Sequence, residues 1–162
     1  ARAEGDAQLL APSGTLRVGI YPGSPTSMVT DASGKAHGLA YDLGGELAKR
    51  LGVGIDYVRL ERVADIVSAI RDGQVDFTVT NATPARAREV SFSQPVLAIE
   101  LGYLVPANSP IGKVEDIDKP GVRIGVTRGS TSERTLPARF RNAVVVPADS
   151  VKLAIAMFAR GE

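Results

Sequence analysis

Strand-like segments alternate with helix-like segments along most of this chain. The first strand is predicted over Thr15–Ile20, which is rich in β-branched and aliphatic residues and is followed by the turn-forming run Tyr21–Pro25. A helix capped by Asp42 is predicted next, because leucines recur every fourth residue over Leu43–Leu51. Such alternation favours an α/β fold with a parallel or mixed sheet, in which ligands bind at the carboxyl ends of the strands.

The same alternation continues beyond that helix. Further strands are predicted over Ile55–Val58, Val75–Thr80, Ile99–Val105, Val122–Val126 and Val144–Val146. Further helices are predicted over Val63–Ile70, from Thr83 to Glu89, over Gly129–Phe140 with a disturbance at Pro137, and along a face formed by Val151, Ala154, Ile155 and Phe158. Asp31–Gly34 is predicted to be a turn between two short extended pieces.

Two composition changes suggest the domain organisation. Residues 1–13 are mostly small and polar and have no sustained period, which predicts a mobile leader. The proline-containing run Pro106–Pro110 has the composition of a crossover between two lobes. We therefore expect a first lobe over residues 14–105, a partial second lobe over 106–162, and a hinge near Leu104–Asn108.

The composition excludes several functional classes. The net charge of +1 with scattered basic residues argues against a nucleic-acid partner. The longest apolar stretch, Val96–Val105, is interrupted by Glu100 and is shorter than the roughly 20 residues of a membrane helix. The absence of cysteine excludes disulfides and thiolate metal sites. The first residues do not have the pattern of a signal peptide, which is expected both of a cytosolic protein and of a secreted protein that has already been processed.

The segment from Thr80 to Arg86 is the strongest candidate for a binding site. Arg86 falls in the first turn of a helix that begins at Thr83, where the helix dipole makes a cation unfavourable by up to about 1 kcal/mol. A bound carboxylate would make the positive charge of Arg86 favourable at this position, and Asn81 and Thr83 would be additional hydrogen-bond donors to it. The alternative is a surface ion pair between Arg86 and Glu89, and the residues alone do not separate the two.

A second candidate anion site lies in Gly125–Thr131, where a strand is expected to run into a helix. Gly129 permits close approach of the backbone, and Ser130 and Thr131 supply hydroxyls. The glycines are one residue too close for a P-loop and no lysine follows. An ordinary helix start capped by Ser130 explains the same residues equally well.

No pattern of covalent or metal chemistry is found. The single histidine, His37, lies in a turn-rich stretch and is expected at the surface, and no metal-ligand cluster or nucleophile elbow is present. Val63 and Ile66 are expected in a helix core, whereas Tyr21 follows a strand and could line a pocket. We expect no cofactor, no metal and no catalytic residue.

Landmarks over most of residues 14–162 resemble family 3 of the bacterial extracellular solute-binding proteins. They are Leu16–Ile20, Gly38–Leu43, Glu46–Val53, Ile70–Phe77, Thr83–Arg86, Val90–Pro95 and Val122–Val126. The resemblance implies a periplasmic-binding-protein-like type II fold with two hinged α/β lobes that close over a ligand. It also implies a periplasmic, non-enzymatic protein that delivers a carboxylate-bearing solute, such as an amino acid, to the membrane permease of an ABC transporter.

The resemblance carries roles over to individual residues. Arg86 corresponds to the arginine that holds the ligand α-carboxylate. Ser130 and Thr131, and less securely Thr127, correspond to second-lobe ligand contacts. The remaining expected ligand contacts are Tyr21 as the stacking aromatic, Val63 as a pocket residue, Thr83 in the turn before Arg86, and Asn81 in place of a serine or threonine. The loop after Tyr21 departs from the aromatic-rich family pattern, and a chain two residues shorter before Arg86 leaves the role of Asn81 open.

A larger departure lies at the end of the sequence. The family places an acidic partner for the ligand ammonium shortly after a Gly-x-Val-Asp motif, and this sequence ends at Gly161 and Glu162, before that residue, the return hinge and the closing helices. We therefore expect a C-terminally incomplete chain that binds ligand poorly, exposes apolar faces and could self-associate through them.

Two other functions are considered, a periplasmic dehydratase-like enzyme on the same scaffold and the ligand-sensing module of a membrane receptor. Arg128 gives weak support to an acidic ligand.

Overall fold

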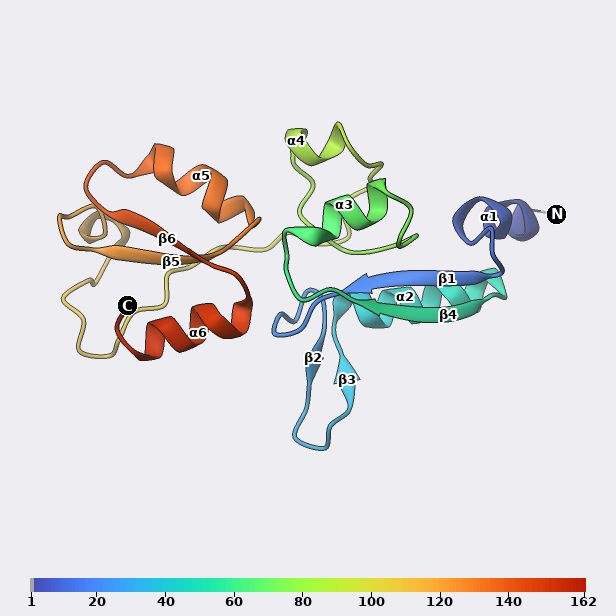
Figure 1. The fold of residues 1–162 in the computed structure, drawn as a ribbon, viewed down its shortest axis with the longest axis horizontal. Helices are drawn as coiled ribbons and strands as arrows, with labels where there is room; N and C mark the ends of the chain where they lie inside the picture. The colour runs from blue at the N-terminus through green and yellow to red at the C-terminus, as the bar shows by residue number, and fades with distance from the viewer. Residues whose placement is uncertain (1) are drawn as a thin grey trace.

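The computed structural model describes residues 2–162, with side chains from residue 4 onward, and has two α/β lobes that lie side by side (Figure 1). We call the part up to helix α4 (Pro84–Ala87) lobe 1 and the part from the 3-10 helix η1 (Val114–Asp116) onward lobe 2. Each lobe has its own hydrophobic cluster. The lobe 1 cluster includes Leu16, Val18 and Ile20, and the lobe 2 cluster consists of Ile117, Ile124 and Val126.

The centre of lobe 1 is a parallel pair of strands, β1 (Thr15–Ile20) and β4 (Gly54–Arg59). The predicted strand over Val75–Thr80 does not form as a regular strand. It lies along the other edge of β1 and makes one parallel bridge between Val18 and Phe77. Around this bridge the backbone N–H groups of Asp76 and Phe77 both donate to the carbonyl of Arg17, and the N–H of Gly19 donates to the carbonyl of Phe77.

Helix α2 (Leu39–Leu51) packs on this strand pair with a face that differs from the predicted one. Its buried residues are Ala40, Gly44 and Ala48, whereas the leucines lie beside this stripe and are half-buried. Small residues let the helix axis approach β1 closely, so the side of the helix with the least bulk faces the sheet. Asp42 is not the cap residue, since the helix begins at Leu39 after Gly38, and the Asp42 carboxylate accepts a hydrogen bond from the backbone N–H of Gly38.

The remaining elements of lobe 1 follow the predicted order. Strands β2 (Val29–Thr30) and β3 (Ala36–His37) form an antiparallel hairpin around the predicted turn, and His37 is exposed as expected. Helix α3 (Asp65–Arg71) buries Ile66 and Ala69. The last helix of the lobe, α4 (Pro84–Ala87), is one turn long.

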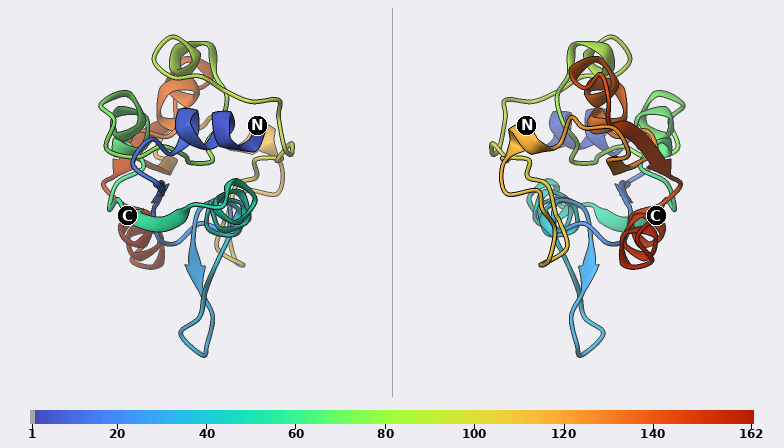
Figure 2. Two further views of the ribbon diagram at one scale, coloured as in Figure 1. Left: turned by 90° about the vertical axis from the view of Figure 1, so that its right-hand side faces the viewer. Right: turned by 90° about the vertical axis from the view of Figure 1, so that its left-hand side faces the viewer.

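The N-terminal segment differs from expectation. Helix α1 (Arg2–Leu10) stands where the sequence predicts a mobile leader, and it packs beside α2 (Figure 2). Ala11, directly after α1, is 3% exposed and belongs to the lobe 1 cluster. Burial of this one residue ties the helix to the lobe, a tertiary effect that the local sequence does not show.

The segment between the lobes contains no regular secondary structure, so the strand predicted over Ile99–Val105 is wrong. Its apolar side chains point largely to solvent, with Leu101 67% and Leu104 77% exposed. A strand requires a neighbouring ladder, and the described residues supply none here. Tyr103 and Ile111 differ, since both pack against the lobe 2 cluster, and the Tyr103 ring contacts Phe140 edge to face at 6.3 Å between centroids.

Lobe 2 contains a second parallel strand pair, β5 (Arg123–Thr127) and β6 (Val144–Ala148), preceded by η1 (Val114–Asp116). Helices α5 (Thr131–Arg139) and α6 (Val151–Ala159) lie on opposite sides of this pair (Figure 1). Both helices were predicted, but much of the apolar face of α6 is uncovered in the described chain, with Ile155 61% exposed. None of the helices within residues 2–162 is both long enough and apolar enough to span a bilayer.

Candidate functional site

Arg86 lies at the interface of the two lobes and is 4% exposed. The α4 turn places it there because Thr83 caps the helix, accepting a hydrogen bond from the backbone N–H of Arg86 at 3.2 Å. The guanidinium Nη1 donates to Thr80 Oγ1 at 2.7 Å and to the Asn81 carbonyl at 3.3 Å. Nη2 donates across the lobes to the Gly129 carbonyl at 3.1 Å. The guanidinium therefore bridges lobe 1 and lobe 2.

All three acceptors of the Arg86 guanidinium are neutral oxygens. Glu89, the alternative partner considered from the sequence, instead pairs with Arg71 at 2.8 Å, so that alternative is wrong. Burial lowers the pKa of Arg86 below its ordinary value, and the positive charge of Arg134 in lobe 2 lowers this pKa further. No carboxylate in residues 4–162 forms an ion pair with this buried cation.

The described residues do not use every N–H of the Arg86 guanidinium. Nε donates no hydrogen bond to the described residues, whereas Nη1 and Nη2 make three hydrogen bonds in total. No buried side-chain nitrogen in the described chain lacks a partner, so Nε retains access to solvent. A guanidinium N–H forms charge-assisted hydrogen bonds to carboxylates.

Asn81 and Thr131 connect the lobes directly. The Asn81 amide donates to Thr131 Oγ1 at 3.1 Å, so the two predicted ligand contacts contact each other across the interface. Gly129 packs beside them against lobe 1, since a Cβ at this position would lie 2.3 Å from the Cα of Ala64. The lobes are in contact here, and only glycine fits at position 129.

The other predicted ligand contacts are Ser130 and Thr127 in lobe 2 and Tyr21 and Val63 in lobe 1. Ser130 accepts a hydrogen bond from the backbone N–H of Glu133 at 3.2 Å and caps α5, which is the structural role considered for it. Thr127 ends β5 and its carbonyl accepts from the N–H of Ser130. Tyr21 is within electrostatic range of Arg86 and partly offsets the lowering of its pKa. Val63 is half-buried just before α3, and no hydrogen bond or ring contact joins it to Arg86.

Arg128 is not an additional positive group at the site. Its guanidinium Nε donates to Asp149 at 2.6 Å, and its Nη1 lies 3.7 Å from a carboxylate oxygen of Glu133. The hydrogen bond to Asp149 is the largest cause of a raised pKa of Arg128. The negative charges of Asp149 and Glu133 raise this pKa further. The suggestion that Arg128 favours an acidic ligand therefore loses its basis.

A cavity of about 370 Å³ opens between α4 and α5 beside Arg86. Its lining includes three arginines and three threonines: Arg86, Arg88, Arg134, Thr83, Thr131 and Thr135. Neither a carboxyl nor an imidazole group is among its lining residues. Sequence reasoning missed Arg134, because only packing of α5 against α4 brings it to this cavity.

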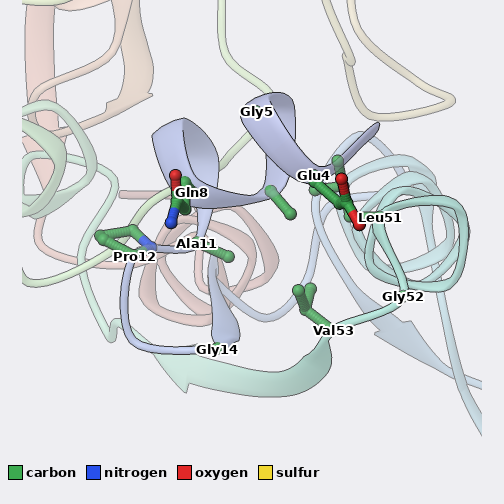
Figure 3. A pocket seen from close by; sticks show the side chains of 10 residues that line it. Glu4, Gly5, Gln8, Ala11, Pro12, Gly14, Leu51, Gly52 and Val53 are labelled. Carbon is green, nitrogen blue, oxygen red and sulfur yellow. The ribbon is translucent and has the colours of Figure 1, made fainter. Parts of the chain in front are cut away.

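A larger hollow of about 790 Å³ lies at the far end of lobe 1, between α1 and the turn after α2 (Figure 3). It is lined mainly by small and apolar residues, including Ala7, Ala11 and Val53. Because it is distant from the lobe interface and has few polar groups, we place the functional site at Arg86. The described residues contain no cluster of three or more potential metal-ligating side chains.

Residues 16–158 match the bacterial extracellular solute-binding proteins, family 3. The lysine/arginine/ornithine-binding periplasmic protein of Escherichia coli (strain K12) is 29% identical over 121 residues, 74% of this chain but 46% of that protein, so the chain spans about half of its length. An ancestral amino acid-binding protein, a precursor of cyclohexadienyl dehydratase, superposes with a TM-score of 0.83 at 28% identity, covering 99% of this chain and 70% of the other. The solute receptor for L-cysteine of Neisseria gonorrhoeae gives a TM-score of 0.79 at 26% identity, covering 93% and 62%.

These similarities agree with the architecture. The two α/β lobes are the arrangement of the type II periplasmic-binding fold, and the superpositions extend over nearly the whole chain. The family match alone covers well over half of the residues. The chain therefore belongs to the bacterial extracellular solute-binding proteins of family 3.

Proposed function

We propose that this protein is the periplasmic solute-binding component of an ABC transporter and that it binds a small carboxylate-bearing solute, an amino acid, between its lobes. The observation that carries the proposal is the state of Arg86, a guanidinium that is 4% exposed and bonded only to neutral oxygens. A buried cation without a counter-charge is costly, and a ligand carboxylate would supply that charge.

The relatives support an amino acid rather than another acid. The names of the three relatives refer to basic amino acids, to amino acids in general and to L-cysteine. These solutes differ in their side chains and share an α-carboxylate and an α-ammonium group. A site that recognises the shared part needs a fixed cation, and Arg86 supplies it from a turn held by the Thr83 cap.

The proposed mechanism is capture without covalent change. Lobe 1 holds the carboxylate through Arg86, assisted by Thr83, with Tyr21 and Val63 on the lobe 1 side. A hinge near Leu104–Asn108 bends, and lobe 2 closes with Thr127, Ser130 and Thr131, while Asn81 exchanges its contact with Thr131 for the ligand. The ligand selects the closed state because it contacts both lobes there, and the permease recognises that state.

An enzymatic function has less support. One solved relative is named as a precursor of a dehydratase, but a dehydratase requires a general acid in the cleft. The cavity beside Arg86 is lined by arginines, threonines, Pro84 and Ala85, none of which serves as that acid. We therefore propose binding and not catalysis.

The test is calorimetric titration of the twenty amino acids into the protein and into Arg86→Ala. The variant should bind the preferred amino acid more weakly by about 2 kcal/mol, because it loses charge-assisted hydrogen bonds to the carboxylate. Arg50→Ala is the control, since Arg50 forms an exposed pair with Glu46 on α2, away from the lobe interface. Equal affinity of Arg86→Ala and the unchanged protein would place the carboxylate elsewhere.

A further inference from the structure

The cavity between α4 and α5 combines positive charges from both lobes. Arg86 and Arg88 belong to the α4 turn of lobe 1, and Arg134 belongs to α5 of lobe 2. Arg86 is buried, whereas the other two are exposed at the rim. All three arginines are among the lining residues of one cavity of about 370 Å³, which is large enough for a small organic solute.

Arg88 and Arg134 differ from most arginines of this chain. Within the described residues their side chains form no ion pair and no hydrogen bond, and neither has a contact that remains unassigned. Seven other arginines contact a carboxylate, whereas Arg123, Arg139 and Arg141 form no ion pair in the described chain; the seven are Arg17, Arg50, Arg59, Arg62, Arg71, Arg128 and Arg160. The cavity is nevertheless the place where three arginines line one space with no carboxyl group among the lining residues.

The positive charges of Arg86 and Arg134 repel each other across the lobe interface. The charge of Arg134 acts on Arg86 across the lobe interface and lowers the pKa of Arg86, so closing the lobes brings two like charges together. One carboxylate at Arg86 relieves the buried charge but leaves Arg88 and Arg134 without a counter-charge. A second anionic group on the same solute would neutralise these two, and it would favour the closed state in which both lobes line the cavity.

We propose that the cavity selects a solute with two anionic groups, such as an acidic amino acid, with one carboxylate on Arg86 and the second between Arg88 and Arg134. This inference rests on the proposed function and specifies the solute class of the same site. The hydroxyls of Thr83 and Thr131 line the cavity and provide additional donors to the two carboxylates. Selectivity against lysine-like solutes follows, because a cationic side chain would meet two guanidinium groups.

The experiment compares matched acids and amides by calorimetry: L-glutamate with L-glutamine and L-aspartate with L-asparagine, with L-lysine and L-arginine as cationic probes. The protein should bind the preferred acid at least about tenfold more tightly than its amide, the effect expected of a charge-assisted contact. In the double variant Arg88→Gln/Arg134→Gln this ratio should fall to near one, while amide affinity stays unchanged. The control Arg139→Gln/Arg141→Gln removes two positive charges of lobe 2 that do not line the cavity and should leave the ratio unchanged.

The outcomes separate the two proposals. Equal binding of acids and amides, or tighter binding of lysine or arginine, overturns the acidic-solute inference and leaves amino-acid binding intact. A double variant that loses acid and amide affinity alike also overturns it, because the arginines would then support the fold and not the second carboxylate. Absence of binding by all twenty amino acids at millimolar concentration, where the weak binding expected of an incomplete chain is still measurable, overturns the proposed function itself.

Discussion

At the scale of single residues, Gly44 shows how closely helix α2 approaches strand β1. A Cβ at this position would lie 2.7 Å from both methyl groups of Val18, which is itself 0% exposed. Neither group has room to move, because Val18 is enclosed by the lobe 1 cluster.

Gly44→Ala should therefore destabilise the protein, by about 1–3 kcal/mol, in spite of the better helix propensity of alanine. The free energy of unfolding in urea measures this. Gly5→Ala is the matched control on helix α1, where a Cβ would meet nothing within 4 Å, and it should be neutral or stabilising by up to about 1 kcal/mol. A stable Gly44→Ala would show that α2 lies farther from β1.

At the scale of elements, Asp76 fastens the irregular segment Val75–Thr80 to β1. Its carboxylate accepts two hydrogen bonds from the Arg17 guanidinium, at 2.7 and 3.0 Å, and one from the Arg17 backbone N–H at 2.9 Å. Burial acts to raise the pKa of Asp76, but the hydrogen bonds and charge of Arg17 outweigh it, and the net shift of this pKa is downward. The side chain thus replaces ladder contacts that the backbone does not make.

The lowered pKa of Asp76 predicts a pH dependence of stability. A carboxyl group whose pKa is lower in the folded than in the unfolded state, where it is about 3.9, stabilises the fold above that value. This stabilisation is lost as the pH falls through the folded-state pKa. Asp76→Asn should cost about 1–2 kcal/mol of unfolding free energy at pH 7, and the difference from the unchanged protein should shrink below about pH 3.

Urea unfolding at pH 7 and at pH 2.5, roughly one and a half pH units below the unfolded-state pKa, measures both values. Glu61→Gln is the control, because the Glu61 side chain is 71% exposed and pairs with Arg59 at the surface, so its effect should stay below about 0.5 kcal/mol. An Asp76→Asn penalty that is the same at both pH values would assign the effect to packing and not to charge.

At the scale of the whole molecule, the contact between Gly129 and Ala64 sets how closely the lobes approach. The interface is also joined by the Asn81–Thr131 hydrogen bond, and Val151 of α6 lies against the loop at Gly23. These contacts are few and polar or small, which suits an interface that must open and close.

Gly129→Ala should force the lobes apart, because the added Cβ would overlap Ala64, and small-angle X-ray scattering should show a larger radius of gyration. Gly129 has a φ of 78°, so the substitution also strains the backbone. Gly121→Ala controls for that strain, since Gly121 has a φ of 85° and open space around its Cβ position. If both variants scatter like the unchanged protein, the Gly129 contact does not limit closure.

The sequence by itself determined the local structure wherever the pattern of a segment agreed with its surroundings. β1 over Thr15–Ile20, the hairpin around Asp31–Gly34, the Thr83 cap and the strand–helix order of lobe 2 are all confirmed. Their signals come from β-branching, turn chemistry and capping, which act over a few residues. Ligand contacts and the lobe boundary after Val105 stay predictions.

Only the tertiary structure decided which residues meet across the chain. It buried Ala40, Gly44 and Ala48 of α2 instead of the leucines, because contact distance to β1 outweighed hydrophobicity. It left Ile99–Val105 irregular, because a strand requires a neighbour that its own sequence cannot supply. It brought Arg134 to Arg86 across 48 positions of sequence, a distance over which no local pattern carries information.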